Sequence, residues 1–398
     1  MSQLVYIIVG EPSGDILASR LLMALKKRDS NLSFAGIGGE TMIALGFKSF
    51  FSISDLSVMG VWEVVPRLPL ILKRRNQIVE DITQQQPNVI VTVDSWGFVR
   101  AVIKKLKKRG VGIPIVHYVA PQVWAWKKSR APQAAKMFDR LMTLWPFELP
   151  YFEKYGLNCH FVGHPVVENV AGVSDDLSEF RERCKIPMSS TVLCVLPGSR
   201  HSEVKRLIPV FSRVVSRLHT QFPNLFLLIP TINSIAEEVE QAFAKMSVPH
   251  CIVRGQSDRY QAFRCSCFAI AASGTVTLEL AACSTPHLIA YRFSRLTNLI
   301  AKVFVTAPYA NLINILAQRE VIPEFVLANC RSDLIHAKAL ELMCDAQNAQ
   351  EQVKQAKQHL LQLQPGGTTP SQKAAEVIYN TIRTHKPSSD HHTHCPRG

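Results

Sequence analysis

Short runs of apolar and β-branched residues alternate with longer amphipathic stretches along most of the chain, and this alternation limits the fold more than any other feature. Leu4–Val9 precedes the helix-like stretch Ile16–Arg28, and Asn88–Asp94 precedes Phe98–Arg109. This order is typical of βαβ units, which build a parallel sheet covered by helices on both faces. We therefore predict an α/β fold with doubly wound sheets. The other predicted strands are Ser33–Ile37, Pro114–Val119, Leu141–Trp145, Thr191–Leu196, Leu225–Pro230, Cys251–Arg254, Phe268–Ala272 and His287–Tyr291.

A polar and charged stretch, Gly163–Pro187, separates two blocks of this alternation. We predict one Rossmann-like domain over residues 1–165 and a second over residues 166–345, facing each other across a cleft. Residues 346–385 have helical periodicity, which predicts C-terminal helices. Residues 386–398 are expected to be disordered.

The chain carries 45 Lys and Arg residues against 31 Asp and Glu residues, a net charge of +14. This balance indicates an anionic partner, which could be nucleic acid, a phosphorylated small molecule or the anionic face of a membrane. The sequence shows neither a signal-peptide pattern nor an apolar run of about 18 residues, so we expect a cytoplasmic protein without a membrane span. The ten cysteines lack C-x-x-C spacing, which predicts reduced thiols and no zinc site.

The first predicted strand runs into a turn of small residues, Gly10-Glu11-Pro12-Ser13-Gly14-Asp15, that opens a helix. Such a turn exposes backbone N–H groups, so Glu11, Ser13, Gly14 and Asp15 are candidates for binding an anion or a sugar. The turn has neither the G-x-G-x-x-G spacing of a dinucleotide site nor a Walker A lysine. The competing interpretation is a tight turn in which Asp15 supports the start of the helix.

Asp94 stands at the carboxyl end of a predicted buried strand. An acid at this position points beyond the edge of the sheet, where partial desolvation raises its pKa and suits it to general-base catalysis. Asp94 is therefore the candidate base. A helix N-cap formed by Asp94 or Ser95 is the competing interpretation.

Aromatic residues with polar tips are concentrated in the string His117-Tyr118-Val119-Ala120-Pro121-Gln122-Val123-Trp124-Ala125-Trp126. Aromatic faces beside a side-chain amide suit a sugar or a base, which makes Gln122 and Trp124 candidate contacts. Packing of the tryptophans in the core explains the string equally well.

Two turns of the second half suit phosphate binding. Pro197-Gly198-Ser199-Arg200 follows a strand and places an arginine at a helix start, where its guanidinium and the backbone donors of Gly198 and Ser199 could hold a phosphate. Ser273-Gly274-Thr275 follows a later strand in the same way, and Glu279 lies one turn into the next helix, where it could accept hydrogen bonds from ribose hydroxyls. Together the two turns predict a nucleotide-diphosphate site.

Segment 58–75 joins apolar residues to a basic cluster. Such a segment suits insertion into an anionic membrane surface, although a core helix with a solvated basic end has the same composition. The candidate membrane contacts are Leu68, Leu70, Ile71, Leu72, Lys73, Arg74 and Arg75.

Over residues 3–385 the chain resembles the bacterial lipid-A-disaccharide synthase family. The resemblance rests on strings that occur in the family's order, the tryptophan string and Leu196-Pro197-Gly198-Ser199-Arg200 being the most specific. The other matching strings are Gly10-Glu11-x-Ser13-Gly14-Asp15, Val58-Met59-Gly60-x-x-Glu63-Val64, Pro146-Phe147-Glu148, Gly163-His164-Pro165, Ser273-Gly274-Thr275 with Glu279, and Asn314-Ile315-Leu316-Ala317.

The resemblance implies a GT-B fold and an inverting, metal-independent transfer from UDP-2,3-diacylglucosamine to 2,3-diacylglucosamine 1-phosphate. It implies that Asp94 is the base, that Arg200 and Asn314 are needed for activity, and that Met59 and Glu63 belong to the acceptor cleft. It also implies a homodimer that acts at the inner face of the inner membrane, with no cofactor and no nucleic-acid partner. In such a dimer we expect the helices of residues 346–385 to pack back on the N-terminal domain of the same chain or of the partner chain.

Two positions depart from the usual family pattern. Many members have a second acid three residues after the aspartate, where this chain has Gly97, and a glycine where this chain has Gln318. Two other classes compete with the assignment. A related GT-B enzyme, such as a UDP-N-acetylglucosamine epimerase, would share the nucleotide site, and a nucleic-acid binder would share the charge.

Overall fold

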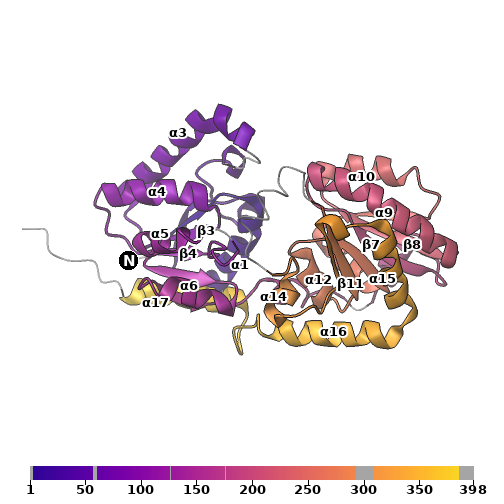
Figure 1. The fold of residues 1–398 in the computed structure, drawn as a ribbon. Helices are drawn as coiled ribbons and strands as arrows, with labels where there is room; N and C mark the ends of the chain where they lie inside the picture. Colours follow the sequence, from indigo (N-terminus) through magenta and orange to yellow (C-terminus); the bar gives the residue numbers. More distant parts are fainter. Residues whose placement is uncertain (1–2, 57–60, 126, 175, 293–307, 385–398) are drawn as a thin grey trace, which may run out of the picture. The chain divides into compact units, whose positions relative to one another are not determined.

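The chain forms two compact units, unit 1 (Met1–Pro165 and Gln364–Gly398) and unit 2 (Val166–Leu363), each built on a six-stranded parallel sheet (Figure 1). The predicted α/β fold class is therefore confirmed. The structure is a computed structural model, and its description covers residues 3–56, 61–125, 127–174, 176–292 and 308–384, with residues 61–65 described by their backbone alone.

Unit 1 has the strand order β2-β1-β3-β4-β5-β6. All its strands are parallel, but successive strands are added toward one edge of the sheet up to β2 and toward the other edge from β3 onward, so the strand order reverses between β1 and β3. Its elements are β1 (Leu4–Val9), α1 (Pro12–Arg28), β2 (Ser33–Ile37), α2 (Glu40–Ala44), η1 (Ile53–Asp55), α3 (Val61–Gln85), β3 (Val89–Val93), α4 (Trp96–Lys108), β4 (Ile115–Tyr118), α5 (Arg130–Met137), β5 (Arg140–Thr143), η2 (Pro146–Glu148), α6 (Leu149–Glu153), β6 (Asn158–Phe161) and α17 (Pro370–Thr384).

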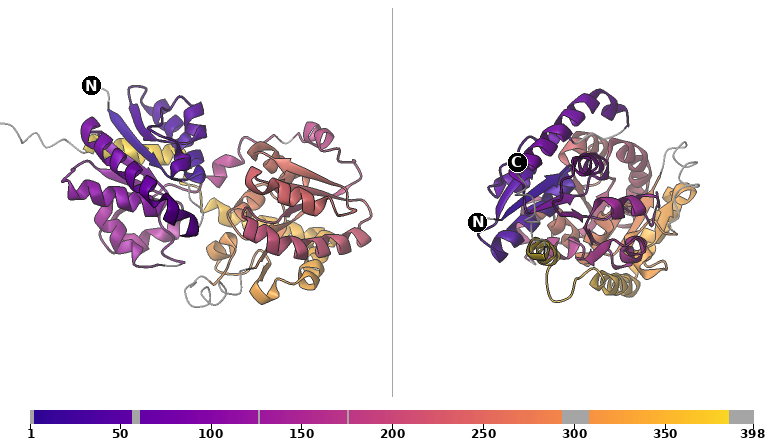
Figure 2. Two further views of the ribbon diagram at one scale, coloured as in Figure 1. Left: turned by 90° about the horizontal axis from the view of Figure 1, so that it is seen from above. Right: turned by 90° about the vertical axis from the view of Figure 1, so that its left-hand side faces the viewer.

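Helices cover both faces of this sheet. Alternate residues of a strand point to opposite faces, so Val5 and Ile7 of β1 pack in one core with α1 and α17, whereas Tyr6 and Ile8 pack in another with α3, α4 and α5. Helices α1 and α17 lie side by side although the whole of unit 2 separates them in the sequence (Figures 1 and 2).

Unit 2 has the strand order β12-β11-β10-β7-β8-β9, which reverses between β7 and β10. Its elements are α7 (Val166–Asn169), α8 (Ser178–Arg183), β7 (Thr191–Leu196), α9 (His201–Gln221), β8 (Leu225–Thr231), η3 (Asn233–Ile235), α10 (Ala236–Phe243), β9 (His250–Arg254), α11 (Gln256–Cys265), β10 (Phe268–Ala272), α12 (Val276–Ala282), β11 (His287–Tyr291), α14 (Leu312–Ala317), β12 (Glu324–Val326), η4 (Leu327–Asn329), α15 (Ser332–Cys344) and α16 (Ala346–Leu361).

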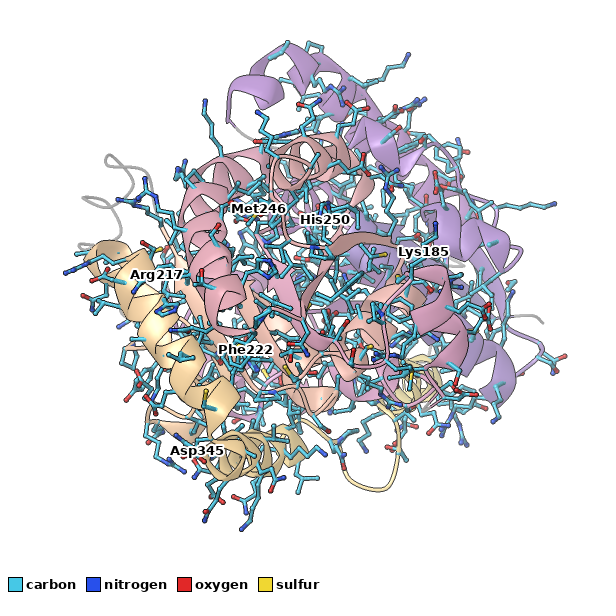
Figure 3. All side chains as sticks on the ribbon, turned by 90° about the vertical axis from the view of Figure 1, so that its right-hand side faces the viewer. Lys185, Arg217, Phe222, Met246, His250 and Asp345 are labelled. Atoms are coloured by element: carbon cyan, nitrogen blue, oxygen red, sulfur yellow. The ribbon has the colours of Figure 1, made fainter. Side chains whose placement is uncertain are left out.

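The two ends of this sheet are distinct. Lys185, Phe222 and Met246 mark the loops that lead into the amino ends of β7, β8 and β9 (Figure 3). Helices α9, α10 and α15 cover one face, and α8, α11 and α12 cover the other. The loops at the carboxyl ends of the strands are left to form a site.

Two of the differences between the observed and the predicted elements concern the sheet edges and the C-terminal helices. The edge strands β6 and β12 were not predicted, because they have four and three residues and no continuous apolar run. The C-terminal helices divide between the units: α17 packs on α1 and β3, but α16 packs on α12, α14 and α15 of unit 2. Helix α16 therefore does not join the N-terminal domain within this chain, in contrast to the expectation for residues 346–385. The predicted disordered tail, 386–398, lies outside the described residues.

Candidate functional site

A cavity of about 180 Å³ lies in unit 2 at the carboxyl ends of β7 and β10, where the strand order reverses. Doubly wound sheets bind their ligands at this position. The structure brings both predicted phosphate turns to the cavity, with Arg200 next to the lining residues. The lining consists of Leu196, Gly198, Ser199, Glu203, Pro230, Thr231, Ile232, Arg259, Ala272, Ser273, Gly274, Thr275, Val276 and Glu279.

Glu203, which the sequence analysis did not single out, organises the turn after β7. Its Oε2 accepts the Ser199 N–H at 3.0 Å, and its Oε1 accepts the Arg200 Nη1 and the Tyr291 hydroxyl, each at 3.1 Å. Gly198 has a φ of +117°, and a Cβ there would lie 2.7 Å from the Cβ of Glu203, so the turn requires glycine. The Ser199 amide that we expected to meet a phosphate is therefore bonded to a carboxylate of the chain.

Arg200 is nevertheless placed to meet a ligand. Its side chain is 65% exposed although it pairs with the buried carboxylate of Glu203. It precedes the first residue of α9, where the helix dipole favours negative charge. A guanidinium has five N–H donors, so one ion pair leaves others to bind an anion.

The turn after β10 carries the second group of predicted residues. The Ser273 hydroxyl donates to the Ala310 carbonyl at 2.9 Å, whereas Gly274 and Thr275 are exposed at the start of α12. Glu279 is mostly buried, and its Oε1 accepts the Arg259 Nη2 at 2.9 Å. Burial raises the pKa of Glu279, and the charge of Arg259 lowers it in part. Arg259 was not predicted, because only the fold brings α11 to this cavity.

Asn314 is fully buried, and both the nitrogen and the oxygen of its side-chain amide form hydrogen bonds. Its Nδ2 donates to the Ile322 carbonyl and to the Glu324 carboxylate, both at 2.7 Å, and its Oδ1 accepts the N–H groups of Val321 and Ile322 at 2.8 and 2.9 Å. These bonds tie α14 to the segment that leads into β12. They give Asn314 a structural role that needs no contact with a substrate.

In unit 1 the turn after β1 touches the turn after β3. Asp94 and Ser95 both have a φ of 51°, in the left-handed region, and a Cβ on Gly10 would lie 2.2 Å from the Ser95 Oγ. Gly14 of the first turn is buried. Ser95 occupies the N-cap position of α4, but its side chain forms no hydrogen bond to the backbone of the helix. The hydrogen bond that a capping Ser95 side chain would make is therefore not observed. Burial raises the pKa of Asp94, and a hydrogen bond from the Ser95 backbone lowers it in part.

Asp15 supports a helix other than its own. It is buried, its Oδ1 accepts the Gly39 N–H at 2.7 Å, and its Oδ2 accepts both the N–H of Thr41, at 2.8 Å, and the Thr41 hydroxyl. These donors lie at the start of α2, so Asp15 acts as a remote cap for that helix. Glu11 and Ser13 are exposed in the same turn.

The tryptophan string leads to a buried carboxyl group. Trp124 is half-buried, and its indole N–H donates to the Glu148 Oε1 at 3.2 Å, while the Trp145 amide donates to the Glu148 Oε2 at 3.3 Å. Phe147 lies edge-on to Trp124, and Gln122 is exposed. Burial raises the pKa of Glu148 to about 8. In the sequence Glu148 is distinguished only as part of the string Pro146-Phe147-Glu148, since nothing local shows that this acid is buried.

Helix α3 exposes part of the predicted membrane segment. Leu68 and Leu72 are 46% and 38% exposed, whereas Leu70 and Ile71 are half-buried. Lys73 is exposed and Arg75 half-buried; Arg74 pairs with an aspartate of η1 at 2.6 Å. Within the described residues, none of the helices combines the length and apolarity needed to span a membrane. Met59 and the Glu63 side chain lie outside the described part of the structure.

Comparison with known proteins identifies a family. A family model described as lipid-A-disaccharide synthetase matches residues 5–378. A lipid-A-disaccharide synthase of Paramagnetospirillum magneticum is 43% identical over 386 residues, which cover 96% of this chain and 98% of that protein. Another, from Rickettsia bellii, is 36% identical and covers 94% of this chain and 98% of its own length.

Solved structures share the fold at low identity. A UDP-GlcNAc 2-epimerase of Neisseria meningitidis bound to UDP-GlcNAc has a TM-score of 0.65 at 10% identity and covers 96% of this chain and 100% of its own. A glycosyltransferase of Rickettsia africae has a TM-score of 0.60 at 12% identity, with 97% and 100% coverage. These structures support the two-domain α/β fold of GT-B enzymes.

Proposed function

The chain belongs to the family of lipid-A-disaccharide synthases, and on this premise we propose the reaction that it catalyses. UDP-2,3-diacylglucosamine donates its sugar to the 6-hydroxyl of 2,3-diacylglucosamine 1-phosphate, which yields the β-1,6-linked disaccharide 1-phosphate and UDP. The full-length family match carries this proposal. The epimerase alternative rests on likeness of fold alone, and fold does not determine function.

The donor binds in the unit 2 cavity in this proposal. The exposed guanidinium of Arg200 and the turn Ser273–Thr275 take the diphosphate, and the mostly buried carboxylate of Glu279 takes the ribose hydroxyls. Arg200 also stabilises the negative charge that develops on the departing UDP. Asn314 acts by holding α14 against residues 321–324, and thus as a positioning residue rather than as a group that touches the reacting atoms.

Asp94 is the base in this proposal. An α-linked donor and a β-linked product require inversion, so one in-line displacement suffices: the acceptor oxygen attacks the anomeric carbon as Asp94 takes its proton and the bond to UDP breaks. The half-buried position of Asp94 beside the Gly10 turn supports this role. The active form is the carboxylate. Activity therefore falls as the pH drops through the pKa of Asp94, which burial places above the ordinary value for aspartate.

The location that we propose for the enzyme in the cell also follows from its substrates. Both carry acyl chains, so we propose that the protein acts as a peripheral enzyme at the cytoplasmic face of the inner membrane and that Leu68, Leu72 and Lys73 of α3 contact the lipid surface. The homodimer that the resemblance implies remains a prediction.

The base is tested with Asp94→Asn. The variant keeps the shape of the side chain but cannot accept the proton, so we expect kcat to fall about 100-fold to 10,000-fold with little change in the KM for the donor. The measurement is mass detection of the disaccharide 1-phosphate formed from the two acylated substrates. Asp29→Asn is the matched control, because Asp29 ends α1 at the amino end of the sheet. Near-normal turnover of Asp94→Asn would remove Asp94 from this role.

A further inference from the structure

Two donors from α11 converge on one oxygen of Glu279. The Arg259 Nη2 lies 2.9 Å from Oε1, and the Tyr260 hydroxyl lies 3.1 Å from the same atom. Among the described residues Oε2 has no hydrogen-bond partner, although Glu279 lines the cavity. The carboxylate is thus held by one oxygen, and its second oxygen remains able to accept hydrogen bonds.

Tyr260, one of the two donors, is itself held in place by its neighbours. Tyr260 is 2% exposed, its ring packs edge-on to Phe263, and the Gln256 Nε2 donates to its hydroxyl at 3.3 Å. The Arg259 Nη2 also lies 3.5 Å from this oxygen, so with two donors directed at it the tyrosine hydroxyl uses its own proton for Glu279. The side chain of Arg259, which is 28% exposed, adds a positive charge beside the carboxylate. Position and charge of the carboxylate are therefore both determined by α11.

We propose that Arg259 and Tyr260 are positioning residues that give the donor site its preference for ribose over 2′-deoxyribose, because they direct the Glu279 Oε2 at the vicinal hydroxyls of the nucleotide. The inference rests on the proposed UDP site and adds to it the residues that set the selectivity for the sugar of the nucleotide. A carboxylate oxygen only accepts hydrogen bonds, so it rewards each hydroxyl of the ligand, and a buried acceptor left without its donor is costly.

The charge of Glu279 depends on the same two residues. Burial raises its pKa, while Arg259 and the Tyr260 hydrogen bond lower it. Removal of either group favours the protonated acid, which is a poorer acceptor and is free to rotate. The ribose preference should therefore weaken before the binding of the diphosphate does.

The test is calorimetric titration of the full chain with UDP and with 2′-deoxy-UDP, the ratio of the two Kd values being the readout. For the wild type we expect UDP to bind roughly 10-fold to 100-fold more tightly, as for a hydrogen bond to a charged group. Tyr260→Phe and Arg259→Gln should each lower this ratio by about 3-fold to 10-fold, and Glu279→Gln should bring it to within about 2-fold of unity. Arg259→Lys keeps the charge and should retain a larger ratio than Arg259→Gln.

Tyr155→Phe is the matched control, since Tyr155 is an exposed tyrosine of unit 1. If the wild type binds UDP with the expected preference and neither Tyr260→Phe nor Arg259→Gln changes the ratio, the inference is overturned and the proposed donor site stands. If the wild type does not bind UDP, the donor site itself is wrong and the inference falls with it. Equal binding of UDP and 2′-deoxy-UDP by the wild type also overturns the inference.

Discussion

Glu148 and Asp94 are carboxyl groups of unit 1 whose pKa is raised by burial, but their surroundings differ. Glu148 is 1% exposed, and its two oxygens accept bonds from Trp124 and Trp145. Asp94 is half-buried and follows a strand at the point where the strand order reverses. The first arrangement holds the aromatic residues in place, whereas the second suits proton transfer from a ligand to the carboxylate.

The raised pKa of Glu148 predicts that the stability of unit 1 depends on pH. In the folded protein it is about 8, above the ordinary value of 4.5, so the folded state binds this proton more tightly than the unfolded chain does. The stabilisation is complete below the ordinary pKa and is lost as the pH rises through about 8. Glu148→Gln removes the ionisation, so the free energy of unfolding should fall less steeply between about pH 5 and about pH 9 than in the wild type.

Urea unfolding followed by tryptophan fluorescence measures this effect. All five tryptophans lie between Trp62 and Trp145, and the signal therefore reports on unit 1. The exposed Glu153→Gln serves as the control and should follow the wild type at every pH. An identical pH dependence for Glu148→Gln and the wild type would show that Glu148 is not the group responsible.

At the scale of elements, α3 differs from the other long helices of unit 1. Its C-terminal half packs Ile78, Val79 and Ile82 into the core, but further toward its N-terminus Leu68 and Leu72 are exposed. An aspartate of η1 engages Arg74, whereas Arg67 and Lys73 are exposed basic side chains beside the leucines. The C-terminal half of α3 therefore agrees with the interpretation as a core helix. The exposed leucines nearer its N-terminus agree with the interpretation as a membrane contact.

We predict that Leu68→Ser combined with Leu72→Ser reduces the binding of the protein to vesicles that contain anionic phospholipid. Each leucine contributes apolar surface to the contact, so the partition coefficient measured by vesicle sedimentation should fall roughly 10-fold or more. Leu361→Ser, on the exposed side of α16, is the control and should sediment like the wild type. Equal sedimentation of the double variant would place the membrane contact elsewhere.

At the scale of the whole molecule, the chain returns to unit 1 after it has completed unit 2. Ala374, Val377 and Ile378 of α17 are buried in the same core as β1 and α1. Unit 1 thus depends on a segment that follows unit 2 in the sequence, whereas unit 2 is one continuous segment.

Ile378→Ala tests this dependence. The side chain is fully buried, so we expect the variant to lower the free energy of unfolding of unit 1 by about 2–4 kcal/mol. Tryptophan fluorescence during urea unfolding again reports on unit 1. Ile43→Ala, which removes an isoleucine that is 50% exposed, should cost less than about 1 kcal/mol. Comparable losses for the two variants would contradict a core role for α17.

The sequence by itself determined the fold class, most of the strands, several of the helices, and the residues that form the two phosphate turns, because side-chain periodicity and turn chemistry act over a few neighbouring residues. The family followed from strings of residues in order. Edge strands β6 and β12 were not predicted, because strands of four and three residues are too short to show a periodicity.

Only the tertiary structure decided which groups each polar atom meets. Asp15 reaches the start of α2, Asn314 holds the segment before β12, and Arg259 arrives at the donor cavity on α11. The division of α16 and α17 between the units was likewise decided by packing. Hydrogen bonds and core contacts depend on distance in space, and a sequence determines that distance only through the complete fold.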